Sequence, residues 1–115
     1  MTECAALLDY ADRLLNGAID IGARGPRTAA LLARSALEDW LEEQTASWSS
    51  PALGFPTTKS KIIALGALQG ADVGEQARRV WHGLSRAVHR HAYELQPSVA
   101  EIRYLAAEIR ELVNA

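Results

Sequence analysis

The sequence predicts an all-α protein that folds as an up-and-down bundle of about five helices. Apolar residues make up 49% of the chain but aromatic residues only 6%, so the core must be built mainly from Ala, Leu, Ile and Val. This composition favours helices. Segments with helical three-and-four spacing of apolar residues also follow one another through short connections. A length of 115 residues suits one domain, which we expect to span residues 1–115.

The first two predicted helices cover about residues 3–18 and 26–45. The apolar face of the first consists of Cys4, Leu7, Leu8, Ala11, Leu14, Leu15 and Ala18. Gly22 and Gly25 mark the loop that follows it, and Pro26 suits the first turn of the next helix. The apolar face of this second helix consists of Ala29, Ala30, Ala33, Ala36, Leu37, Trp40 and Leu41.

Residues 47–57 form a predicted loop, because their Ser, Pro and Gly residues cannot sustain a helix together. The large apolar side chains in it are Trp48, Leu53 and Phe55. We interpret them as core side chains rather than as a binding site, since large apolar groups tend to be buried.

Polar residues predict where the last three helices begin. Thr57 or Thr58 can cap a third helix that ends near Gly70. Asp72, followed three residues later by Glu75, has the spacing of a capping box for the fourth helix. Ser98 and Glu101 have the same spacing at the start of the fifth.

Cysteine content and hydropathy indicate the compartment. Cys4 is the only cysteine, so neither an internal disulfide nor a Cys-rich zinc site is expected. The N-terminus lacks a signal-peptide pattern, and no apolar run approaches the roughly 18 residues of a membrane span. These features predict a cytoplasmic protein without a membrane association.

Charge is distributed unevenly along the chain. The net charge is −2, which argues against a broadly basic nucleic-acid-binding surface. Residues 76–93, however, contain no Asp or Glu. The same stretch contains Arg78, Arg79, Arg86, Arg90, His82, His89 and His91. We expect a local positive patch on an otherwise acidic protein.

Most of these residues share one face of the fourth helix. At about 100° per residue, an arc of roughly 100° contains the following six side chains: Arg79, His82, Arg86, His89, Arg90 and Tyr93. Guanidinium groups bind phosphate oxygens, and imidazoles exchange protons near neutral pH. Together they could cut RNA without a metal, because a base activates the 2′-hydroxyl and a cation stabilises the charged phosphorane.

The direction of His91 depends on where the fourth helix ends. In an unbroken helix it points about 140° away from Arg86. If the helix unwinds before Pro97, His91 can turn back toward Arg86. The sequence leaves both arrangements open.

Arg86 and His91 form an Arg-x4-His motif, which resembles that of the HEPN superfamily of small all-helical domains. The surrounding segment LSRAVHRHAYELQPS is similar to the C-terminal part of a group of short actinobacterial proteins. The resemblance implies a homodimer in which Arg86 and His91 of both subunits share one cleft. It also implies RNA as the substrate and a toxin or defence role.

On this resemblance, His91 would be the general acid or base and Arg86 the phosphate clamp. The residues expected in RNA binding or orientation are Arg79, His82, His89, Arg90 and Tyr93. HEPN nucleases often have Asn, Asp or His directly after the arginine, whereas this chain has Ala87. The sequence predicts no cofactor. A metal site is not expected either, because the histidines lack a nearby carboxylate and the arginines would repel a cation.

Two other functions remain open. The chain could be a non-catalytic helical interaction module whose arginine face meets an acidic, antitoxin-like protein partner. It could also bind a nucleotide or another small phosphate ligand without cleaving it.

Overall fold

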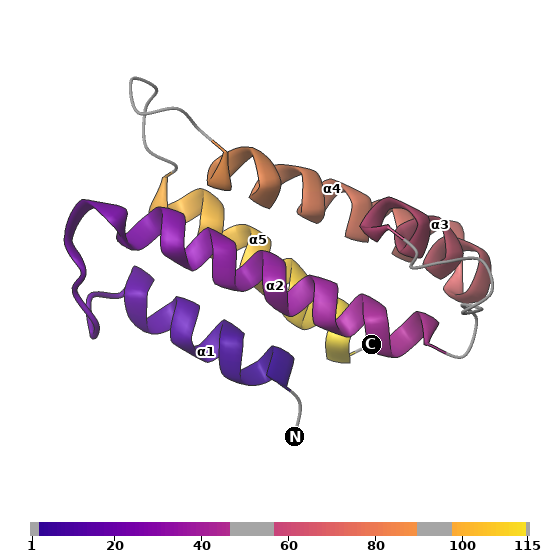
Figure 1. Ribbon diagram of the computed structural model, residues 1–115, viewed down its shortest axis with the longest axis horizontal. Helices are drawn as coiled ribbons and strands as arrows, with labels where there is room; N and C mark the ends of the chain where they lie inside the picture. The colour runs from indigo at the N-terminus through magenta and orange to yellow at the C-terminus, as the bar shows by residue number, and fades with distance from the viewer. Residues whose placement is uncertain (1–2, 47–56, 90–97, 115) are drawn as a thin grey trace.

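The computed structural model describes residues 3–46, 57–89 and 98–114 (Figure 1). These residues form a short 3₁₀ helix and five α-helices, with no strand among them. The elements are α1 (Glu3–Leu15), η1 (Gly22–Arg24), α2 (Gly25–Thr45), α3 (Thr58–Gln69), α4 (Ala71–Val88) and α5 (Val99–Asn114). The prediction of an all-α helical bundle is therefore confirmed. Within the described ranges, no helix has the length and apolar character needed to cross a bilayer.

The long helix α2 is the centre of the bundle, because it contacts each of the other four α-helices. Figure 1 shows that α1, α2, α4 and α5 run in alternating directions along the long axis of the molecule. The shorter helix α3 lies at one end, where it packs against α4 and α2. The C-terminal end of α4 lies at the opposite end, near the start of α5.

The core is built from small and branched aliphatic side chains, as the composition predicts. The largest fully buried side chains come from all five α-helices and include Leu8, Leu37, Leu41, Leu65, Leu84, Ile102 and Ile109. Alanines of α2 and α4 are also buried, and they let the central helices approach closely. Trp48, Leu53 and Phe55, expected in the core, lie outside the described residues.

Two of the three predicted helix caps are present. The Thr57 hydroxyl accepts a hydrogen bond from the backbone N–H of Ser60 at 3.1 Å, and the Ser98 hydroxyl accepts one from Glu101 N–H at 3.0 Å. The predicted Asp72 cap is wrong. Helix α4 already begins at Ala71 and has Gly70, at φ +114°, as its N-cap. Gly70 both ends α3 and starts α4, so no residue with a capping side chain stands between the two helices.

The first helix is shorter than predicted and ends at Leu15 instead of Ala18. Gly17 follows with φ +84°, a backbone conformation that ends helices and that glycine adopts without steric cost. The Leu15 carbonyl accepts a hydrogen bond from Arg103 of α5 at 3.2 Å. Pro26 stands in the first turn of α2, as predicted.

Candidate functional site

The predicted arginine and histidine face runs along α4 and its C-cap. Arg79, His82, Arg86 and His89 are all exposed. Arg90, His91 and Tyr93, which were also predicted to belong to the site, lie outside the described residues. The side chains that can be placed differ strongly in their partners.

Arg79 is engaged with α5. Its Nη2 donates to Oε1 of Glu108 at 2.8 Å, and the Glu108 side chain is only 7% exposed. The hydrogen bond to Glu108 raises the pKa of Arg79 above its usual value. The other Glu108 carboxylate oxygen is buried and has no hydrogen-bond partner among the described residues. Arg79 therefore joins α4 to α5 and neutralises a buried carboxylate, a role that local sequence did not indicate.

Arg78 has a different partner on its own helix. Its guanidinium donates to both carboxylate oxygens of Glu75, at 2.8 and 2.6 Å. The hydrogen bond from Arg78 lowers the pKa of Glu75. The stretch without Asp or Glu therefore still has carboxylates next to it. Glu75 precedes it on α4 and binds Arg78, and Glu108 of α5 binds Arg79.

The C-terminal end of α4 brings an imidazole and a guanidinium together. Nε2 of His89 lies 3.3 Å from Nη1 of Arg34 on α2. Because a guanidinium can only donate, a hydrogen bond between these two atoms has Nε2 as the acceptor. Sequence reasoning missed Arg34. The available signal was its spacing of seven residues from Arg27, which places two arginines on one face of α2.

Arg86 lies in the last turn of α4, close to this contact in the chain. Its guanidinium is exposed and makes no hydrogen bond or ion pair with any other described residue. The His89 N–H donates to the Ser85 carbonyl at 3.0 Å, which completes the end of the helix. The Ser85 hydroxyl is buried and lacks a partner within the described ranges. The Arg86 guanidinium, in the last turn of α4, interacts favourably with the negative end of the helix dipole.

Ala87, the residue after the motif arginine, points into the core and is 2% exposed. It contributes to the packing of α4 rather than to the exposed face. No polar group from this position is therefore available beside Arg86.

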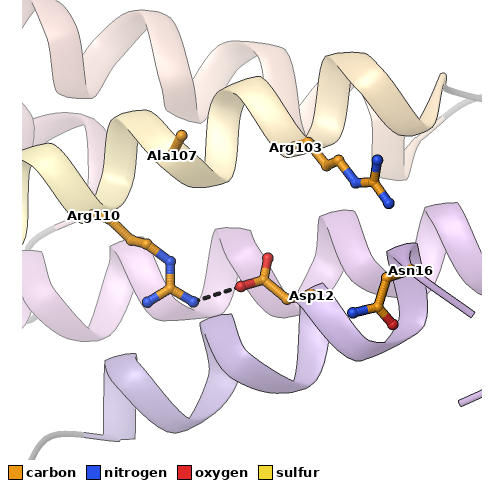
Figure 2. A pocket seen from close by; sticks show the side chains of 5 residues that line it. All are labelled: Asp12, Asn16, Arg103, Ala107 and Arg110. Atoms are coloured by element: carbon orange, nitrogen blue, oxygen red, sulfur yellow. Dashed lines mark hydrogen bonds and ion pairs between the residues drawn. The ribbon is translucent and has the colours of Figure 1, made fainter. Parts of the chain in front are cut away.

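A second polar surface lies between α1 and α5 (Figure 2). It is a pocket of about 470 Å³ lined by Asp12, Asn16, Arg103, Ala107 and Arg110. Arg110 donates to Asp12 at 2.7 Å and to Asp9 at 3.0 Å. Together with the hydrogen bond from Arg103 to the Leu15 carbonyl, these contacts join α5 to α1. We assign this surface to the stability of the bundle.

The described residues contain no cluster of three or more His, Cys, Asp or Glu side chains that could hold a metal ion. Comparison with protein-family models, curated proteins and solved structures finds no match for this chain.

Proposed function

We propose that the chain is a HEPN-like, RNA-directed protein that acts as a metal-independent endoribonuclease in the form of a homodimer. The observation that carries this proposal is the contact between Arg34 and His89 at the C-terminal end of α4. Arg86 lies in the same turn, and its guanidinium bonds to no other described residue. The His89 imidazole and two guanidiniums at one surface can bind and orient RNA phosphates, and proton transfer is assigned to His91.

The roles follow from the chemistry of each group. Arg86 clamps the scissile phosphate, because its guanidinium is exposed and makes no bond to another described residue. His91 acts as the general acid or base in the cleft shared by two subunits. His82, His89, Arg90 and Tyr93 bind or orient the RNA, and a toxin or defence role in the cytoplasm is the biological setting that the HEPN resemblance suggests. Arg79 has a structural role in this scheme, since Glu108 already occupies it.

Cleavage of RNA in the presence of excess EDTA tests the proposal. Purified protein is incubated with mixed RNAs that include tRNA, beside the variants Arg86→Ala and His91→Ala. We expect products with 2′,3′-cyclic phosphate ends, and a fall in rate of about 100-fold or more in each variant. Arg13→Ala is the matched control, because Arg13 is an exposed arginine of α1 and should leave the rate unchanged.

Three outcomes would contradict the proposal. One is the absence of cleavage by a well-folded dimer, and another is cleavage that persists in both site variants. The third is a strictly monomeric chain in light scattering, because a monomer cannot form a cleft from two subunits.

Burial of Ala87 favours the alternative of a non-catalytic interaction module with an acidic protein partner. Ala87, directly after Arg86, packs in the core. The exposed face of α4 therefore has arginines and histidines but lacks the Asn, Asp or His that HEPN nucleases often have at this position. A folded dimer that forms a stable complex with an acidic partner protein and leaves every RNA intact would support this alternative.

A further inference from the structure

A small pocket between α3 and α4 combines an apolar floor with a cationic rim. Its volume is about 160 Å³, and it is lined by Lys59, Ile62, Ile63, Arg78, Trp81 and His82. Ile62 is buried, whereas the Ile63 side chain is 66% exposed at the mouth. Three basic side chains around one aromatic wall make a surface that suits an anionic ligand with a flat apolar part.

Trp81 forms the aromatic wall of the pocket, and its contacts with Glu38 and His82 fix its orientation. The indole N–H of Trp81 donates to Oε2 of Glu38 on α2 at 3.3 Å. The same oxygen accepts a hydrogen bond from the Thr58 hydroxyl of α3 at 3.3 Å. The His82 ring meets the indole edge-on, with 5.4 Å between the ring centroids. Trp81 is therefore ordered before any ligand binds, which lowers the entropic cost of binding.

The rim has basic side chains available for an anion. The side chains of Lys59 and His82 make no hydrogen bond or ion pair with any other described residue, whereas the Lys61 side chain, in the same turn of α3, is paired with Glu42. The Lys59 ammonium stands in the first turn of a helix, where the dipole disfavours a cation. An anionic ligand would offset that cost.

We propose that this pocket binds one base of a single-stranded RNA, with an adjacent phosphate on Lys59 and His82. The pocket is smaller than the roughly 300–1,000 Å³ of sites that enclose a whole small molecule, so it takes one part of a larger ligand. A nucleobase stacks on an aromatic side chain whatever its sequence, while cations follow the backbone. The inference rests on the proposed RNA-directed function and gives its substrate class as a single strand.

The pocket and Arg86 lie on neighbouring parts of α4. His82 lines the pocket, and Arg86 follows it four residues later on the same exposed face. At about 1.5 Å per residue, the two positions are about 6 Å apart along the helix. One strand can therefore place a base in the pocket and an adjoining phosphate near Arg86.

Binding of a non-cleavable strand tests the inference separately from catalysis. The probe is a fluorescein-labelled 2′-O-methyl oligoadenylate, whose fluorescence anisotropy is measured at several salt concentrations in EDTA. We expect Lys59→Ala to reduce the slope of log K against log salt by about 0.7, the value for one phosphate contact to a single strand. Lys61→Ala is the matched control, because Lys61 does not line the pocket.

The apolar wall has its own pair of variants. We expect Ile63→Ala to weaken binding about tenfold, because three carbon atoms that pack against the base are lost. Leu68→Ala should change binding less than about twofold. Leu68 is also exposed on α3, at 54%, but does not line the pocket. Trp81→Leu should weaken binding about fivefold or more.

The outcomes separate the two proposals. Binding that depends on Lys59 and Ile63, without any RNA cleavage, would support the pocket and overturn only the nuclease activity. Cleavage that depends on Arg86, with unchanged oligonucleotide binding in Lys59→Ala and Ile63→Ala, would overturn only the pocket. Tighter binding of an acidic, aromatic peptide than of the oligonucleotide would overturn the assignment to RNA.

Discussion

Arg78 and Arg79 are neighbours in the sequence, yet they have different physical roles. The partner of Arg78 is Glu75, whose side chain is 54% exposed, and both groups stay hydrated when they separate. The partner of Arg79 is Glu108, which is nearly excluded from water. Exposed ion pairs contribute little, whereas a buried carboxylate without its partner is costly. Burial of the acid therefore decides which arginine matters for stability.

We expect Arg79→Ala to lower the melting temperature clearly more than Arg78→Ala, because only Arg79→Ala leaves a buried carboxylate unpaired. Thermal unfolding followed by circular dichroism at pH 7 measures both variants. Adding Glu108→Gln to Arg79→Ala should recover part of the loss, since the neutral amide is cheaper to bury. Equal effects of the two arginine variants would contradict this interpretation.

At the scale of helices, α3 and α4 are joined through Gly70 and approach each other closely at Gly66 and Gly74. A Cβ added at Gly74 would lie 2.7 Å from the Gly66 Cα and 3.1 Å from its backbone nitrogen. A Cβ added at Gly66 would lie 3.6 Å from the Gly74 Cα, which is ordinary contact. The crossing therefore requires glycine on α4 but not on α3.

We expect Gly74→Ala to destabilise the protein by about 2 kcal/mol or more, because backbone atoms cannot move aside as a flexible side chain can. Gly66→Ala should be neutral or should stabilise by up to about 1 kcal/mol, since alanine is the better helix former. Urea unfolding of both variants gives the two free energies. A Gly74→Ala variant as stable as the wild type would show that the helices do not cross this closely.

On the scale of the whole molecule, acidic residues gather where the start of α1 meets the second half of α2. The pKa of Asp39 is raised, first by partial burial and then by repulsion from Glu3, Glu38 and Glu43. Its folded-state pKa thus lies above the unfolded value, so the folded state holds the proton more tightly. The contribution of Asp39 to stability is lost as the pH rises through the folded-state pKa.

We therefore expect Asp39→Asn to be more stable than the wild type at pH 7, by up to about 0.5 kcal/mol because solvent screens an exposed group. The difference should shrink as the pH falls through the folded-state pKa of Asp39, where the carboxyl takes up its proton. Urea unfolding across this pH range measures it. Asp72→Asn is the control with the opposite sign, because it removes a favourable charge from the first turn of α4.

Local sequence determined the helices and several of their ends. Apolar spacing predicted every α-helix, and Thr57 and Ser98 were identified as caps, because these signals depend on residues within one or two turns. The exposed positions of His82 and Arg86 on α4 follow from the same periodicity. The prediction of Asp72 as a cap was wrong for a local reason too, because Gly70 is both the C-cap of α3 and the N-cap of α4.

Tertiary structure alone decided which charged groups meet. Glu108 reaches Arg79 across 29 positions of sequence, and Arg34 reaches His89 across 55. The pocket at Trp81 likewise depends on Lys59 and Ile63 of another helix. Helical periodicity fixes the face on which a side chain lies but not the helix that packs beside it. Those partners are set by how the five α-helices fill a shared core.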